Sequence, residues 1–519
     1  MTNDPLPPAI DWAAHPPADA LDRLGILIDS SFDQGNAAAL RQALRASEAL
    51  ATRQLSTEQA LLLDYFTANA WANIRVLSRS GSEDVWDWEQ EEFEKEVLHL
   101  RRALASSAFG GLPKVRQCQV LTNLANALNQ VGRFVEAMEY WDRALEVDSA
   151  FGMAHGNRGC GLTTYAHSLY DDGHQLLFLK YARRSLKAAI DSPIHEEARP
   201  TFQKAIGAIE AIVSKDALSS EDPRIAPNPK KTDQEIAYRK WCLANRLFLN
   251  PLNDLGTDGL AERDVLTTPS IVTGIDEGPY YPGFYNQMKQ EFVSARYFLF
   301  EGTTADAPHF SDRDVLLYNT LDYPAYSLAV ERTKAAFRAA YSVLDKIAFF
   351  LNHYLGFQIP ERQVNFRTFW YEAQDRRRGL RSFLRCRANL PLRGLFWVSK
   401  DMYEDQQDFR DAMQPDARNL AEIRNHLEHK YLKVHDEMWS GPLDPQDKVS
   451  RALADTLAHS LRRAELEAKT LRLVKVTRAA LSYLSLAVHV EERHRAKDRP
   501  KDKLVLPMPL DVIEDDWKR

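Results

Sequence analysis

The stretch NLAEIRNHLEHKYLKVH, residues 419 to 435, decides how this chain is interpreted. Arg424 and His429 lie five residues apart in it, which places them about 140° apart around the axis of an α-helix. Asn425 lies four residues before His429 and shares its face. The apolar residues recur at three- and four-residue spacing, so the pattern predicts an amphipathic helix with a stripe formed by Leu420, Ile423 and Leu427.

Two structural alternatives compete with a reactive centre here. Arg424 could simply pair with Glu428, a helix-surface contact that contributes roughly 0.2–0.5 kcal/mol. A zinc site could use His426 and His429 with His435 nearby, but the order HLEH is neither HExxH nor HxxEH. No third ligand has suitable spacing, so we expect neither a metal nor a cofactor.

Length and net charge limit the number of domains and the kind of surface that the chain can have. A chain of 519 residues is too long for one core, and at roughly 100–200 residues per domain it should form two to four units. The net charge of -7 gives no whole-chain signal for nucleic acid, so any basic surface must be local.

The cysteines, the opening residues and the apolar runs favour a cytoplasmic location. The four cysteines show no CxxC spacing, which argues against both a zinc ribbon and a disulfide framework. The opening MTNDPLPPAIDW lacks the pattern of a secretory signal, and no run approaches the roughly 18 apolar residues of a membrane-spanning helix. We expect a cytoplasmic protein without a membrane partner.

The N-terminal half shows a helical-repeat pattern. After a tail at residues 1–20, helical periodicity runs through residues 21–216, and residues 121–149 fit the 34-residue tetratricopeptide (TPR) pattern. Gly132 falls at the turn of that pattern, and Trp141 fills the groove between the paired helices. We predict a TPR-like helical-repeat domain over residues 21–216, and the alternative is a generic helical bundle.

The C-terminal half is predicted to be a second helical unit. Proline-rich residues 217–235 form a linker, residues 236–310 a connecting segment, residues 311–498 a helical domain and residues 499–519 a tail. Strand patterns are nearly absent, so the fold class is all-α. We predict helices over residues 286–302, 324–356, 390–405 and 419–435, and over 447–495 as one or two helices.

The motif in residues 424 to 431 resembles the HEPN superfamily (higher eukaryote and prokaryote nucleotide-binding domains). The match is R-x4-H, from Arg424 through Asn425 to His429, extended by Tyr431. Upstream, AYSVLDKIAFFLNHYLG resembles the first long helix of a HEPN family, with Asp345 facing the site, and LRGLFWVSKDMYE its second helix. WCLANRLFLNPLND is similar to a segment that precedes the HEPN core in a bacterial family carrying TPR-like helices. The resemblance implies an up-and-down helical bundle and a homodimer.

Many HEPN proteins are metal-independent endoribonucleases, and these residue types suit that chemistry. Attack by the ribose 2′-OH needs a proton acceptor, and histidine with a pKa near ~6.5 can serve as His429. A guanidinium such as Arg424 stabilises the extra charge of the phosphorane. Asn425 could orient His429 or bind a phosphate oxygen, and Asp345 could position Arg424 or the imidazole. In toxin–antitoxin relatives the residue matching Tyr431 is modified, so it is a candidate regulatory residue.

A basic stretch adds a candidate RNA surface. RRRGLRSFLRCRANLPLR, residues 376–393, carries seven arginines and no acidic residue. We assign Arg377, Arg378 and Arg381 to RNA binding, together with Lys430 next to the motif. The alternative is that these basic side chains cover apolar surface or pair with acidic helices.

These patterns together predict a toxin-like or antiviral and stress-defence endoribonuclease. The substrate would be RNA, including tRNA, and a protein trigger would bind the TPR-like domain. The competing interpretation is a non-catalytic interaction protein that binds a protein partner through its repeats and dimerises through its HEPN-like bundle. The intact set Arg424, Asn425 and His429 favours the enzyme.

Overall fold

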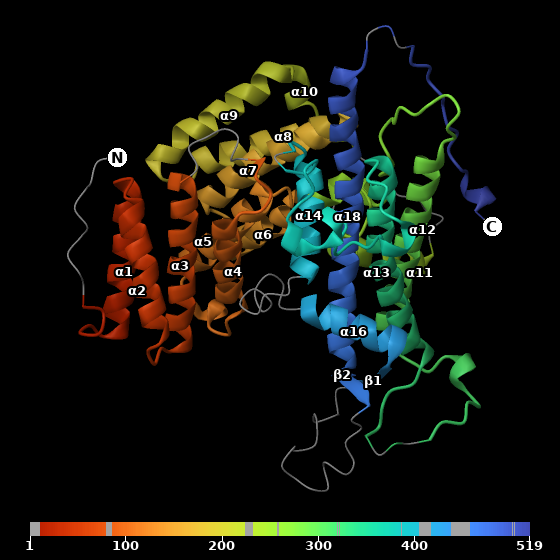
Figure 1. Cartoon of the computed structure of the whole chain (residues 1–519), viewed down its shortest axis with the longest axis horizontal. Helices are drawn as coiled ribbons and strands as arrows, with labels where there is room; N and C mark the ends of the chain where they lie inside the picture. Colours follow the sequence, from red (N-terminus) through yellow and green to blue (C-terminus); the bar gives the residue numbers. More distant parts are fainter. Residues whose placement is uncertain are drawn as a thin grey trace.

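The computed structural model confirms an all-α architecture with one small sheet. It describes residues 11–78, 86–223, 232–256, 259–318, 320, 322–385, 387–403, 417–436, 457–500, 502 and 504–518. The N-terminal helices form one side of the molecule, and a bundle built around the long helix α18 forms the other (Figure 1).

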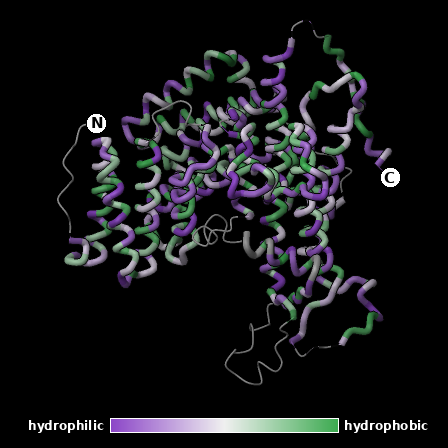
Figure 2. The backbone as a smooth tube through the Cα atoms, in the orientation of Figure 1, coloured by the Kyte–Doolittle hydropathy of each residue, from purple (hydrophilic) through white to green (hydrophobic). Residues whose placement is uncertain are grey.

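The N-terminal helical region consists of antiparallel neighbours stacked in chain order. Hydrophilic and hydrophobic residues alternate along these helices, as expected where one face is buried (Figure 2). The helices are α1 (Pro17–Asp33), α2 (Ala37–Ala51), α3 (Thr57–Ser78), α4 (Glu91–Ala105), α5 (Lys114–Gln130), α6 (Phe134–Val147), α7 (Gly152–Ser168), α8 (Asp172–Ile190), α9 (Arg199–Ile212) and α10 (Lys215–Ser219).

The best repeat match in the sequence is a helical hairpin. Helices α5 and α6 are joined at Gly132, whose φ of 87° is a left-handed conformation that glycine adopts without strain. Trp141 is buried, its indole N–H donates to Asn126 Oδ1 at 3.0 Å, and its ring contacts Gly161 of α7. The hairpin is consistent with a repeat, and Trp141 fills the groove between neighbouring helices as predicted.

The connecting segment joins both halves. It contains α11 (Asp233–Ala244), the short helix η4 (Pro251–Asp254) and the start of α12 (Tyr280–Thr304). Arg478 of α18 is fully buried, where it pairs with Asp254 and donates to the carbonyls of Phe248 and Asn250, each at 2.9 Å. Tyr165 of α7 donates to the other oxygen of Asp254 at 2.9 Å. The segment is therefore bonded to the N-terminal helices and to the bundle.

The bundle is formed by long helices that pack side by side. Helix α18 (Arg463–Asp498) contacts α12, α13 (Leu328–Tyr354) and α14 (Leu390–Tyr403), and α16 (Ala417–His429) crosses near one end (Figure 1). Ser327 caps α13 by accepting from the Val330 N–H at 3.3 Å, and the helix ends two residues before Gly356. The predicted helix at 324–356 is thus confirmed with a slightly later start.

Two predicted helical stretches contain strands. The helix over residues 419–435 ends at His429 and continues as β1 (Tyr431–His435). Within residues 447–495, Ala458–Arg462 is strand β2, parallel to β1, and α18 starts at Arg463. The helix prediction was wrong for these two segments because their backbone groups pair with each other across the sequence, which helix periodicity cannot show.

The remaining regular elements are short 3-10 helices. They are η2 (Phe109–Gly111), η3 (Glu196–Ala198), η5 (Gly259–Ala261), η6 (Phe310–Asp312), η7 (Glu361–Gln363), η8 (Glu372–Gln374), η9 (Arg376–Arg378) and η10 (Asp515–Trp517).

Among the described residues, α18 alone is long and apolar enough to span a membrane by length and composition. Most of its apolar stretch is buried inside the protein, as in the central helix of a helical domain.

Helix α14 docks tightly onto the N-terminal helical region. An added Cβ at Gly394 would lie 2.4 Å from the carbonyl oxygen of Gly132, so the two backbones touch. Asp401 is buried and accepts from both terminal nitrogens of Arg101 at 3.0 and 2.9 Å, and it also pairs with Arg133. Lys400 pairs with Glu94 in the same seam. The hydrophobic core is continuous across this contact.

The close contact at Gly394 gives a stability prediction. Gly394→Ala should lower the thermal unfolding temperature, because overpacking a backbone contact typically costs about 1–3 kcal/mol. The matched control is Gly207→Ala in α9, where an added Cβ meets nothing within 4 Å and alanine should stabilise the helix by up to about 1 kcal/mol. Differential scanning calorimetry of both variants measures the effect; equal or higher stability of Gly394→Ala would contradict the contact.

Candidate active site

Helix α16 carries the motif on a face set by its apolar stripe. Leu420, Ile423 and Leu427 are buried as predicted, and the helix contacts α13 and α14. Arg338 of α13 holds the C-terminal end by donating to the Leu427 carbonyl at 2.8 Å. This packing turns the Arg424 side chain toward α13.

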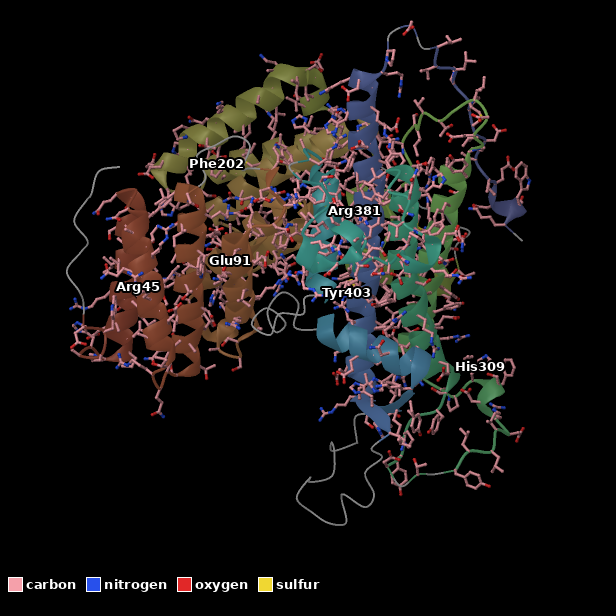
Figure 3. The ribbon with its side chains drawn as sticks, viewed as in Figure 1. Arg45, Glu91, Phe202, His309, Arg381 and Tyr403 are labelled. Carbon is pink, nitrogen blue, oxygen red and sulfur yellow. The ribbon has the colours of Figure 1, made fainter. Side chains whose placement is uncertain are left out.

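The guanidinium of Arg424 lies over an aromatic ring. Its carbon is 5.3 Å from the ring centroid of Tyr341 of α13, a cation–π contact of about 0.5–2 kcal/mol depending on desolvation. The Tyr403 hydroxyl at the end of α14 donates to the Tyr341 hydroxyl at 2.8 Å (Figure 3 labels Tyr403). Three helices therefore fix the position of Arg424.

Asp345 lies one turn beyond Tyr341 on α13. Its Oδ1 accepts from the Phe366 backbone N–H at 3.0 Å. Burial raises the pKa of this carboxyl above its ordinary value, although the Phe366 hydrogen bond and the positive charge of Arg424 act in the opposite direction. The charge of Arg424 is near enough to act on Asp345, which also anchors the loop that follows α13.

The structure describes only some of the other motif side chains. Asn425 and Lys430 are exposed. The backbone of His429 ends α16, and its side chain, like that of Glu428, lies outside the described residues. The structure therefore tests neither the catalytic assignment of His429 nor its Arg424–Glu428 alternative.

Tyr431 is the first residue of β1 and does not continue the motif helix. It is 37% exposed, and its hydroxyl lies 3.4 Å from that of Tyr326. An exposed phenol at a strand edge is accessible to a modifying enzyme.

Tyr403 also lines a pocket of about 480 Å³. Pockets of roughly 300–1,000 Å³ are the usual size for small-molecule ligands such as a nucleotide. Several basic side chains line it against a single carboxylate: Arg367, Arg376, Arg377 and Lys400, with Asp375. Because Tyr403 also contacts Tyr341, on whose ring Arg424 lies, one tyrosine pair connects the pocket to Arg424.

The arginines of residues 376–393 divide into two groups. Arg377 and Arg378 are exposed, and Arg377 is 91% exposed at its side chain beside Asp375. Arg381 instead donates to the Phe369 carbonyl at 2.8 Å and lies 5.0 Å from the ring centroid of Phe357 (Figure 3 labels Arg381). These contacts direct the guanidinium of Arg381 into the fold, and burial lowers its pKa.

Sequence reasoning missed Tyr341, Tyr403 and Arg367. The four-residue spacing from Tyr341 to Asp345 on one helix was a signal that could have located the first. Tyr403 and Arg367 reach the site through the packing of α14 and of the loop after α13, which no local pattern reveals.

The comparison with protein families finds a match in the C-terminal half. The model of the LA2681-like HEPN family matches residues 272–491, which is less than half of the chain, so this region is similar to HEPN domains. HEPN domains are frequently ribonucleases. The match begins within the predicted connecting segment at 236–310 and therefore includes α12. No curated protein and no solved structure matches the chain.

The raised pKa of Asp345 predicts how its replacement by asparagine changes the stability of the fold. The pKa of the Asp345 carboxyl is higher in the folded than in the unfolded protein. Its contribution to folding stability is therefore fully present below the unfolded-state pKa and is lost as the pH rises through the folded-state pKa. Asp345→Asn removes the cost of a buried charge, so at pH 7 the variant should unfold at a higher temperature than the native protein.

Thermal melts of both proteins at several pH values check this prediction. The advantage of Asp345→Asn should shrink as the pH falls, because the native carboxyl then becomes neutral as well. A variant that is less stable than the native protein at pH 7 would show that the carboxylate charge stabilises the fold.

Proposed function

We propose that this protein is a metal-independent endoribonuclease that cleaves RNA through attack of the ribose 2′-OH. The observation that carries the proposal is the placement of Arg424. In a HEPN domain, its guanidinium is held on Tyr341 at the junction of α13, α14 and α16, beside a basic pocket of nucleotide size.

The proposed reaction balances without an added reactant. The 2′-oxygen bonds to the adjacent phosphorus, its proton passes to His429, and the bond from phosphorus to the 5′-oxygen breaks. The products are a 2′,3′-cyclic phosphate and a 5′-OH, which takes up a proton. Arg424 binds the non-bridging oxygens as charge develops, and Asp345 and Asn425 position the two groups.

The basic pocket supports RNA as the substrate. Arg367, Arg376 and Arg377 offer guanidinium groups to phosphates that flank the scissile bond. Arg378 and Lys430 are exposed and extend this surface. Arg381 contributes by holding the loop, given its contacts with Phe369 and Phe357. tRNA is the first substrate to test.

An exposed apolar segment next to the motif supports a homodimer. Between η6 and α13, five large apolar side chains are more than half exposed and form a set with Phe310: Val315, Leu316, Leu317, Tyr318 and Tyr323. The segment is fixed to β1, since the Ala325 N–H donates to the Val434 carbonyl at 2.7 Å. A second copy seated there would bring two motif helices together, so that each site faces its twin.

The N-terminal helical region is proposed to sense a protein trigger. Its contact with the HEPN domain runs through α14, where Asp401 pairs with Arg101 and Tyr403 follows two residues later. A partner that shifts the N-terminal helices would move Tyr403 and, through Tyr341, the seat of Arg424. Such control suits a toxin-like or antiviral defence effector in the cytoplasm, with Tyr431 as a second regulatory point.

Two variants test the nuclease. Arg424→Ala and His429→Ala should each reduce cleavage of total RNA or tRNA by about 10²–10⁴-fold, the usual contribution of a group that transfers a proton or binds a developing charge. The assay contains EDTA, and the RNA ends are mapped for 2′,3′-cyclic phosphate. The matched controls are Arg45→Ala and His195→Ala, which change exposed residues far from the site and should retain full activity.

Retained cleavage in both site variants would refute the assignment. A wild-type protein that binds RNA and protein partners but never cuts would instead identify the non-catalytic interaction protein.

The dimer is tested on the exposed segment. Leu316→Asp should shift the protein from dimer to monomer in sedimentation velocity experiments, because it places a charge in the proposed apolar contact. Leu504→Asp is a matched control, since both leucines are 83% exposed and Leu504 lies in the C-terminal tail. Equal behaviour of the two variants would exclude this surface as the interface.

A further inference from the structure

A second cluster of titratable side chains lies on the side of α16 that faces the sheet. Glu422 and His426 are four residues apart on α16, so they share one face. His459 comes from β2, which the chain reaches after more than thirty residues. The ligand atoms of these three residues all lie within 4.8 Å of one another.

The two imidazoles and the carboxylate are arranged as one group. The rings of His426 and His459 are stacked with centroids 4.8 Å apart and 28° between their planes. His459 Nδ1 lies 3.7 Å from Glu422 Oε1. All three residues are partly buried, in contrast to the fully exposed side chains typical of chance surface clusters.

The backbone orients one of the imidazoles. His426 Nδ1 lies 2.8 Å from the Glu422 carbonyl oxygen, which can only accept a hydrogen bond. Neutral His426 therefore carries its proton on Nδ1 and its lone pair on Nε2. A histidine that donates one ring nitrogen to a carbonyl and offers the other as a ligand is the usual arrangement in metal sites.

We propose that Glu422, His426 and His459 bind one divalent transition-metal ion, with Zn²⁺ as the best match. Two imidazoles and one carboxylate are a recognised protein ligand set for zinc, and water completes the four-coordinate site. The set differs from the zinc alternative of the sequence analysis, because it uses neither His429 nor His435 and gains its third ligand from β2.

The ion would join α16 to β2. The two elements are separated in sequence by β1 and by the residues between the strands, and they meet through the contacts of His459 with Glu422 and His426 and through the parallel pairing of β1 with β2. A metal bond between them fixes the helix that carries Arg424, two residues before His426. This structural role is independent of the proposed nuclease chemistry, in which the 2′-OH supplies the nucleophile.

The test measures metal binding by the full chain without RNA. The purified protein is dialysed against a chelator, and Zn²⁺ is titrated by calorimetry, with Co²⁺ absorption as a probe of coordination. We expect one ion per chain, and we expect His459→Gln and Glu422→Gln to weaken binding by at least about 100-fold. Zn²⁺ should also slow hydrogen exchange in residues 417–436 and 457–462 of the wild-type protein.

Two controls isolate the site. His195→Gln replaces an exposed histidine of the N-terminal half and should bind zinc as the wild type does. Arg424→Ala should keep zinc binding while losing RNA cleavage, so the metal site and the nuclease can fail separately. Circular dichroism at 222 nm verifies that each variant is folded. Absence of stoichiometric binding, or equal affinity in His459→Gln, would overturn the proposal.

Discussion

The buried carboxylate of Asp401 is the interaction on which the two halves of this protein depend. It accepts two hydrogen bonds from Arg101 and pairs with Arg133, and all three side chains are almost completely buried. Removing one partner of such a buried ion pair typically costs about 3–5 kcal/mol of folding free energy, because the remaining charge is left buried without compensation. The network therefore fixes α14 against the N-terminal helices in one register, and the backbone contact between Gly132 and Gly394 permits that approach.

The position of α14 determines the candidate site. Tyr403 follows Asp401 by two residues and donates to Tyr341, on whose ring Arg424 rests. The same tyrosine lines the basic pocket. The candidate site in the C-terminal half is thus connected through α14 to helices of the N-terminal half. This connection is the physical basis for the proposed sensing role of the N-terminal helices.

Helix α16 is held from two sides by different kinds of contact. Its apolar stripe packs on α13 and α14, and Arg424 adds a cation–π contact on that side. On the side facing the sheet, Glu422 and His426 meet His459 of β2. In the proposed reaction, the Arg424 guanidinium would benefit from this fixed position, because a preorganised group needs no reorganisation as charge develops.

The helical class, the Gly132 turn and the apolar stripe of α16 could be predicted from the amino-acid sequence, because each is encoded by spacing within one helix or hairpin. Only the tertiary structure decided that residues 431–435 and 458–462 form paired strands, that Arg381 turns inward and that Arg377 lines a pocket. Tyr403 likewise meets Tyr341, on whose ring Arg424 lies, from a distant part of the chain. His459 meets His426 in the same way. The spacing of apolar residues indicates which face of a helix is buried, but it does not show which other elements pack against that face, and these contacts depend on that packing.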